Sequence, residues 1–151
     1  MTSDPIDRVP GGVHVLPAAE AFWRPSDAMG VLNTDLGAQL QLDWLGARLW
    51  RLTPGQASTR HRHDTQHELY LLLEGTGRIR VGEALLTLEP YSSRVVPPPV
   101  VRQVFNDTAA DALWLVAGAP RELASTAEMR EETLARLYPD GPTALPAELG
   151  G

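Results

Sequence analysis

The chain has 151 residues, 43% of them hydrophobic, no cysteine and a formal net charge of -6. One ordinary domain accounts for this length, and without cysteine the protein has no disulfide, thiol nucleophile or thiolate metal ligand. The acidic balance and the lack of a basic stripe disfavour nucleic-acid binding, and no apolar run approaches the length that spans a bilayer, so no membrane contact is expected.

The N-terminal residues 1–30 are rich in proline and glycine, which predicts an arm outside the main domain. Within this arm we expect a strand over 13–16 and a helical turn over 18–23. Phe22 and Trp23 are expected to dock the arm on the main domain or on a second subunit. The first residues lack the cationic start and apolar stretch of a secretion signal, so we expect a cytoplasmic protein.

Short strands separated by turns follow over residues 31–119. Strands at this spacing are typical of an antiparallel sandwich or barrel, so the predicted fold class is all-β. Residues 69–73 are almost continuously apolar, which predicts a strand covered on both faces. The expected strands are 39–42, 48–52, 69–73, 78–81, 84–88, 94–96, 101–105 and 113–116.

Residues 120–151 are predicted to form a helix followed by a loose tail. Ser125 and Glu128 have the spacing of a capping box, and good helix formers continue from there to Tyr138. Pro139 ends this pattern, and the remaining residues are expected to be loosely held.

The stretch that carries chemistry contains two histidines and a glutamate. His61 and His63 are two positions apart, so both imidazoles point to the same side of an extended chain. The polar residues 64–67 are long enough to turn the chain, which lets Glu68 begin the next strand and face the two histidines. Two imidazoles and a carboxylate suit a divalent metal with open coordination positions. His67 could add a third nitrogen only if the loop turned it inward, and its place beside Glu68 on a strand argues that it points away.

This stretch resembles the first sequence motif of cupins, G-x5-H-x-H-x4-E-x6-G. The defining positions are filled by Gly55, His61, His63, Glu68 and Gly75. The resemblance is to small single-domain cupins of the type-2 conserved-barrel family, and it implies a jelly-roll β-barrel over residues 40–117. It also implies that two copies pair as a homodimer through a barrel sheet.

The second cupin motif, G-x5-P-x-G-x2-H-x3-N, is matched only in part. Pro97 and Asn106 fit it, whereas Tyr91 and Pro99 replace its two glycines. Arg102 occupies the position of the histidine that gives metal-binding cupins their fourth ligand. A guanidinium cannot coordinate a metal, because it is a permanent cation without an acceptor. The resemblance places this side chain inside the barrel.

Two interpretations of Arg102 follow. In the first, Arg102 pairs with Glu68, because a buried charge needs a partner, and the protein is a metal-free, non-catalytic binding or sensor barrel. In the second, His61, His63 and Glu68 hold iron, manganese, nickel or zinc, and Arg102 binds an anionic ligand beside the metal. Tyr70 shares the face of Glu68, so it is expected to line the pocket and contact the ligand.

The sequence thus predicts a barrel that binds a small anionic molecule at a three-ligand metal site, with no organic cofactor. Cupins with such sites include dioxygenases, isomerases and decarboxylases, so a metal-dependent enzyme is one hypothesis. A non-catalytic ligand-binding barrel and a structural or interaction role are the others. Trp50, Phe105 and Trp114 are expected in the core, and at most one of Arg48 and Arg51 faces inward, because they are an odd number of positions apart.

Overall fold

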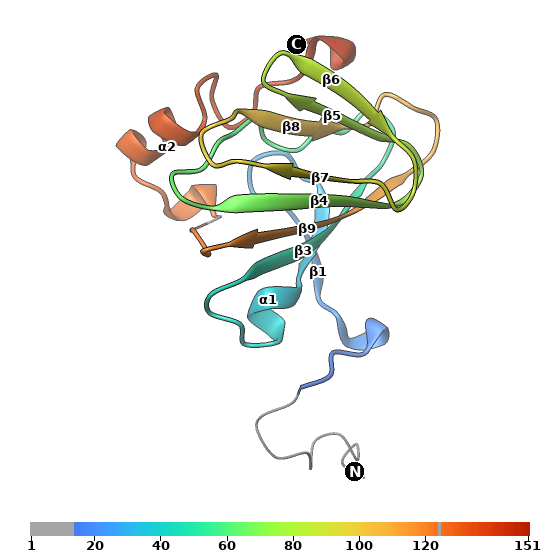
Figure 1. Cartoon of the computed structure of the whole chain (residues 1–151), viewed down its shortest axis with the longest axis vertical. Helices are drawn as coiled ribbons and strands as arrows, with labels where there is room; N and C mark the ends of the chain where they lie inside the picture. Colours follow the sequence, from blue (N-terminus) through green and yellow to red (C-terminus); the bar gives the residue numbers. More distant parts are fainter. Residues whose placement is uncertain (1–13, 124) are drawn as a thin grey trace.

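Nine strands form two antiparallel sheets in the computed structural model, which describes residues 14–123 and 125–151 (Figure 1). The larger sheet has the order β1-β2-β3-β9-β4-β7 and the smaller one the order β6-β5-β8. Several neighbouring strands, such as β3 and β9 or β5 and β8, come from distant parts of the chain, as in a jelly-roll barrel. The strands are β1 (Trp23–Pro25), β2 (Leu32–Asp35), β3 (Gly46–Leu52), β4 (His67–Glu74), β5 (Gly77–Val81), β6 (Ala84–Leu88), β7 (Ser93–Val96), β8 (Arg102–Phe105) and β9 (Ala112–Ala119).

The hydrophobic core lies between the two sheets and confirms the expected all-β barrel. Leu52 and Trp114 from the larger sheet meet Ile79 and Val104 from the smaller one. Gly77 of β5 leaves room for the Trp114 ring of β9, because a Cβ at Gly77 would lie 2.7 Å from that ring. The core therefore fills the barrel on one side and leaves the other side free for polar residues.

Strand β4 is buried on one face only, so the prediction of a strand covered on both faces is wrong. Glu68, Tyr70 and Leu72 point inward and are buried, whereas Leu69 keeps 38% of its surface exposed. The reason is the period of two along a strand: the sheet has the barrel interior on one side and no covering layer on the other.

The chain before β3 differs from the expectation in two ways. The predicted strand over 39–42 is absent: the short helix α1 (Leu36–Gln39) ends at the first of these residues, and 40–41 form a turn. The Asp35 side chain caps α1 by accepting from the Ala38 amide at 2.9 Å. In the arm, the 3-10 turn η2 (Ala18–Glu20) falls in the predicted helical turn, and the rest of 14–22 is irregular. The predicted strand over 13–16 begins outside the described residues, and its described part is not a strand.

Within the arm, the two aromatic residues are placed differently. Trp23 belongs to β1 and is partly buried, whereas Phe22 keeps 68% of its surface exposed. Trp23 therefore packs within this chain as the sequence suggests, whereas docking of Phe22 on a second subunit stays a prediction.

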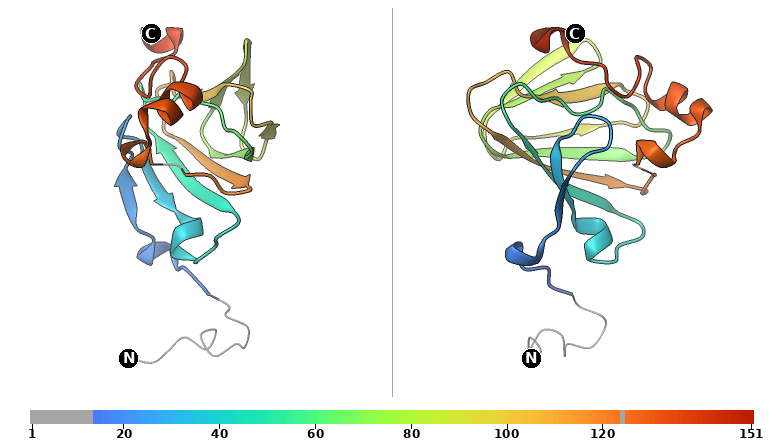
Figure 2. Two further views of the ribbon diagram at one scale, coloured as in Figure 1. Left: turned by 90° about the vertical axis from the view of Figure 1, so that its left-hand side faces the viewer. Right: turned by 180° about the vertical axis from the view of Figure 1, so that it is seen from behind.

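The C-terminal segment packs along the barrel. It comprises the 3-10 turn η3 (Thr126–Glu128), the helix α2 (Glu131–Leu137) and the 3-10 turn η4 (Ala147–Leu149), and Figure 2 shows them wrapped around one end of the barrel and over the smaller sheet. The expected loose tail is held in place, because Arg60 pairs with Asp140 at 2.6 Å and the Gln103 amide donates to the Ala144 carbonyl at 2.9 Å. Over the described part of the chain, no helix has both the length and the apolar character needed to cross a membrane.

Candidate metal centre

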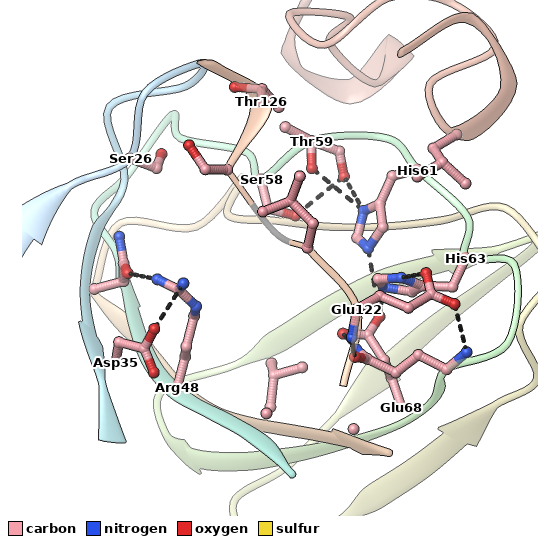
Figure 3. A pocket seen from close by; sticks show the side chains of 18 of the residues that line it. Ser26, Asp35, Arg48, Ser58, Thr59, His61, His63, Glu68, Glu122 and Thr126 are labelled. Carbon is pink, nitrogen blue, oxygen red and sulfur yellow. Dashed lines mark hydrogen bonds and ion pairs between the residues drawn. The ribbon is translucent and has the colours of Figure 1, made fainter. Parts of the chain in front are cut away.

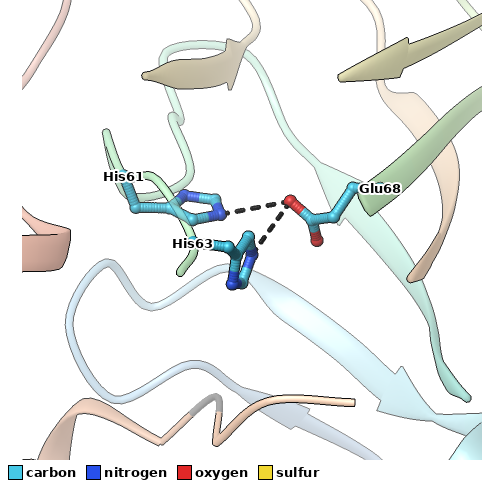
Figure 4. A group of neighbouring side chains, drawn as sticks. All are labelled: His61, His63 and Glu68. Atoms are coloured by element: carbon cyan, nitrogen blue, oxygen red, sulfur yellow. Dashed lines mark hydrogen bonds and ion pairs between the residues drawn. The ribbon is translucent and has the colours of Figure 1, made fainter. Parts of the chain in front are cut away.

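His61, His63 and Glu68 come together at the inner wall of the barrel, as the motif spacing predicts (Figure 4). Their potential ligand atoms all lie within 4.8 Å of one another. Both histidines direct Nε2 at the same carboxylate oxygen, Glu68 Oε1, at 3.3 Å from His61 and 3.1 Å from His63. The three side chains therefore surround one point.

The backbone around the two histidines explains this convergence. His61 forms a bridge with Arg102 of β8, with its amide and carbonyl both paired at 3.0 and 2.8 Å. The His63 amide donates to the Pro98 carbonyl at 2.9 Å. The segment is thus held extended beside β8, so side chains two positions apart share one side. Glu68 reaches them from the start of β4, after the loop 64–66 has reversed the chain.

The other nitrogen of each histidine is held by an acceptor. His61 Nδ1 lies 3.0 Å from the Thr59 carbonyl oxygen, and His63 Nδ1 lies 3.0 Å from a carboxylate oxygen of Glu122. Neither acceptor has a hydrogen to give, so Nδ1 carries the proton on both rings. When the rings are neutral, their Nε2 lone pairs face Glu68, which is the tautomer that metal-binding histidines use when a second group holds Nδ1.

The resulting electrostatics require a positive charge among the three side chains. Although burial opposes its charge, the two histidines hold the pKa of Glu68 well below its usual range, so this carboxylate is ionised. Burial likewise opposes the charged form of His63, but Glu68 and Glu122 outweigh it and raise the pKa of His63. His63 Nε2 is buried and has no hydrogen-bond partner among the described residues. This donor set fits a borderline divalent cation.

Arg102 is placed inside the barrel wall and apart from the cavity that a ligand would enter. Its side chain has no exposed surface and does not line the cavity. The two terminal nitrogens donate to backbone carbonyls at 3.0 to 3.3 Å, and Nε lies 3.6 Å from Glu68 Oε1. The accepting carbonyls lie at the end of β7 and in the turn that follows it, and they are those of Val96, Pro97 and Pro98. These carbonyls occupy the donors that an anionic ligand would need. The ion pair with Glu68 is present, so Arg102 acts on the site through that carboxylate.

Two polar neighbours fix the Glu68 carboxylate. The Tyr70 hydroxyl donates to Oε1 at 2.8 Å, and the Gln66 amide donates to Oε2 at 3.3 Å. Tyr70 lines the cavity as expected, and its hydroxyl group donates its hydrogen to Glu68. Burial and the negative charge of Glu68 raise the pKa of Tyr70 well above its usual value. His67 is exposed and takes no part, in agreement with the sequence.

Glu122, which follows β9, is the main site residue that the sequence did not indicate. It accepts from His63 Nδ1, from the Thr65 hydroxyl at 2.8 Å and amide, and from the Gln66 amide at 2.9 Å. Burial opposes the charge, but these hydrogen bonds lower the pKa of Glu122 to about 2. Gln66 returns the contact by accepting from the Glu122 amide at 3.0 Å. A single carboxylate thus anchors the loop that carries one histidine and precedes Glu68.

A cavity of about 590 Å³ opens from the three side chains into the barrel, a size common for small-molecule sites (Figure 3). Tyr138, the residue after α2, lines this cavity beside His61, with 6.1 Å between the two ring centroids. Burial and the nearby Glu68 raise the pKa of Tyr138 to about 12. Arg48 also lines the cavity, whereas Arg51 pairs with acidic groups outside, so one of the two arginines faces inward as predicted.

The three large aromatic residues divide between core and cavity. Phe105 and Trp114 are fully buried, as expected. Trp50 packs against the core, as expected, and also lines the cavity. Its ring is therefore available to a ligand.

These features define a class: a small jelly-roll barrel with a histidine–histidine–glutamate cluster at its inner wall. A sequence profile of the family described as Cupin domain matches residues 48–118. Residues 48–118 therefore form a domain of the cupin family, and the fold around them is that of a cupin barrel. A search of curated proteins gave no significant match.

Solved structures agree with this assignment. The protein TT1209 from Thermus thermophilus is 36% identical, over 53% of this chain and 76% of that one, with a TM-score of 0.51. A sugar phosphate isomerase from a cupin superfamily, from Silicibacter pomeroyi, is 28% identical over 72% and 76%, with a TM-score of 0.66. A Cupin 2 conserved barrel domain protein from Salinispora arenicola is 18% identical over 71% and 88%, with a TM-score of 0.60, and shows a likeness of fold.

Proposed function

We propose that this protein holds a divalent metal through His61 Nε2, His63 Nε2 and Glu68, and uses it to bind a small anionic molecule in the barrel cavity. The observation that carries the proposal is the direction of the two Nε2 atoms. Both point at one ionised carboxylate oxygen while both Nδ1 protons are held by other acceptors. Without a cation, this point would hold either two lone pairs and a negative charge, which repel one another, or protonated histidines.

Three protein ligands leave coordination positions for a ligand, and iron, manganese, nickel or zinc would supply Lewis-acid chemistry there. The protein's own contribution is orientation. Thr59 and Glu122 hold the histidine rings, whereas Tyr70 and Gln66 hold the glutamate. The similarity to a sugar phosphate isomerase supports a metal-dependent reaction on a small hydroxylated anion.

A second candidate is a metal-free binding or sensor barrel. It is favoured by the 3.6 Å approach of Arg102 Nε to Glu68 Oε1, which provides some of the positive charge that the site requires. In this form Arg102 and protonated histidines neutralise the glutamate, and the cavity binds its ligand without a metal.

Elemental analysis distinguishes the two candidates. The untagged protein, purified without chelator and then reconstituted with each of the four metals, is expected to retain close to one equivalent. His61→Ala and Glu68→Gln should lose it, whereas His67→Ala, which removes an exposed histidine next to the site, should not. Retention of no metal by the wild-type protein would favour the metal-free candidate.

A homodimer also belongs to the proposal. Leu69 of β4 and Val95 of β7 lie opposite each other on the outer face of the larger sheet and keep 38% and 55% of their surface exposed. Light scattering should give twice the monomer mass for the wild-type protein and the monomer mass for Leu69→Lys. A wild-type protein that is monomeric at all concentrations would contradict this part.

A further inference from the structure

A second polar cluster lines the cavity away from the three proposed metal ligands. In Figure 3, Arg48 and Asp35 lie on the opposite side of the cavity from the two histidines and Glu68. The register of β2 on β3 pairs Asp35 with Arg48 and Asn33 with Trp50, and all four residues line the cavity. The cavity therefore joins two chemically different walls.

Arg48 is fixed in position by its neighbours. Nη1 donates to Asn33 Oδ1 at 2.8 Å, and Nη2 lies 2.9 Å from Asp35 Oδ2. Asn33 is itself held by two backbone carbonyls, and Asp35 caps α1. The arginine is therefore oriented before any ligand arrives, and its side chain lines the cavity with N–H donors to spare.

The charges on this part of the lining balance one another. Three further arginines line the cavity. Arg24 pairs with Asp27 at 3.3 Å, Arg121 donates to the Leu42 carbonyl beside Asp43, and Arg62 donates to the Arg136 carbonyl. With the Arg48–Asp35 pair, three of these guanidinium groups, those of Arg24, Arg48 and Arg121, thus lie beside three aspartates. A wall without excess charge has no preference for a second anion. Closely spaced donors and acceptors instead match hydroxyl groups, each of which both donates and accepts.

The surfaces between the two walls fit the same chemistry. Trp50 offers an aromatic ring to the C–H face of a ligand, with its centroid 6.0 Å from the Arg48 guanidinium carbon. Hydroxyl side chains, those of Ser26, Ser58, Thr59 and Thr126, also line the cavity. The lining therefore combines an aromatic ring with hydroxyl groups.

From this juxtaposition we propose that the cavity takes a polyhydroxylated acid, with its acid end at His61, His63 and Glu68 and its hydroxylated end on Arg48 and Asp35. Arg48 is then the specificity-determining residue for the hydroxylated end. The inference rests on the proposed function, because the acid end is held by the metal.

Three acids with the same α-hydroxy-carboxylate head test this inference by calorimetry on the metal-loaded full chain. Glycolate carries the head alone, 2-hydroxyhexanoate adds an apolar tail, and D-gluconate adds a hydroxylated tail of the same length. Gluconate is expected to bind at least tenfold more tightly than either of the others, because only its tail hydrogen-bonds to the far wall. Metal content is measured after each titration, so that removal of metal by the acid is not read as binding.

Variants assign the effect to the far wall. Arg48→Met should weaken gluconate binding about tenfold and leave glycolate binding unchanged. Arg51→Met is the matched control, because it removes the same residue type from the same strand on the outer face and should change neither affinity. If Arg48→Met fails to fold, Arg48→Lys keeps the charge beside Asp35 and should still weaken gluconate binding, because it lacks the planar donor fork.

The outcomes separate the two proposals. If glycolate binds but gluconate binds no more tightly, or if Arg48 variants leave gluconate binding unchanged, the inference about the far wall is wrong and the proposed function stands. If 6-phosphogluconate binds far more tightly than gluconate, the far wall selects an anion and the inference is also wrong. If the protein retains no metal and glycolate does not bind, both proposals fail.

Discussion

Glu122→Gln is expected to weaken metal binding although Glu122 is not a proposed ligand. One carboxylate oxygen of Glu122 accepts from the Thr65 amide and hydroxyl and from the Gln66 amide, and the other accepts from His63 Nδ1 and the Asp64 amide. A glutamine has only one acceptor oxygen, and the position with more donors will take it. The NH₂ group then faces the His63 Nδ1–H group, so His63 loses its acceptor.

The magnitude follows from that single contact. A hydrogen bond to a charged group stabilises by about 1.5–3 kcal/mol, and 1.4 kcal/mol corresponds to about tenfold in affinity. Loss of the contact therefore predicts a fall in metal affinity of about 10- to 100-fold, which is the usual range when a group that orients a metal-binding histidine is removed. The fold should be retained, because the glutamine still accepts from the loop amides.

Chelator competition measures this change, with metal affinity determined for the wild-type protein and two variants. Glu128→Gln is the matched control, since Glu128 also lines the cavity from the C-terminal segment and makes none of these contacts with the histidine loop. Wild-type affinity in Glu122→Gln would refute the reasoning, as would an equal loss in Glu128→Gln.

Three further predictions follow from the same geometry. Tyr70→Phe removes the hydroxyl that donates to Glu68 at 2.8 Å, so metal affinity measured by chelator competition should fall about tenfold with the fold intact; unchanged affinity would contradict the role given to Tyr70. Gly118→Ala places a Cβ 2.5 Å from the Gln66 side-chain nitrogen, so Gln66 must move away from Glu68, and both metal affinity and the melting temperature should fall; a variant with wild-type values would show that Gln66 is not needed there. The pKa of Glu122 is lowered from 4.5 to about 2 in the folded protein, so its contribution to stability is fully present above about pH 4.5 and is lost as the pH falls toward 2; denaturant unfolding should show a smaller loss over this range for Glu122→Gln than for the wild-type protein.

Local spacing was enough to predict the proposed metal ligands. His61 and His63 share a side because the chain is extended there, and Glu68 meets them because a polar loop precedes it. Parity along a strand also predicted that only one of Arg48 and Arg51 faces inward. These features depend on neighbours within a few residues, where side-chain direction follows from the backbone alone.

Contacts between distant segments were not predictable in this way. Glu122 meets the loop amide of Gln66 across 56 positions, and no local pattern marks a glutamate after a strand as an anchor for a histidine. The position of Arg102 followed from the cupin motif, but its hydrogen bonds depend on the carbonyls that the β7–β8 turn presents. Residues 69–73 were predicted to be covered on both faces because hydrophobicity alone does not show whether a second layer packs on the sheet.

X-ray diffraction at the absorption edge of the bound metal tests the central claim most directly. Crystals of the reconstituted protein are expected to show one anomalous peak, about 2.0–2.2 Å from Nε2 of His61, Nε2 of His63 and a carboxylate oxygen of Glu68, with Nδ1 of both histidines still on Thr59 and Glu122. A peak elsewhere on the chain, or no peak with Arg102 in contact with Glu68, would contradict the account.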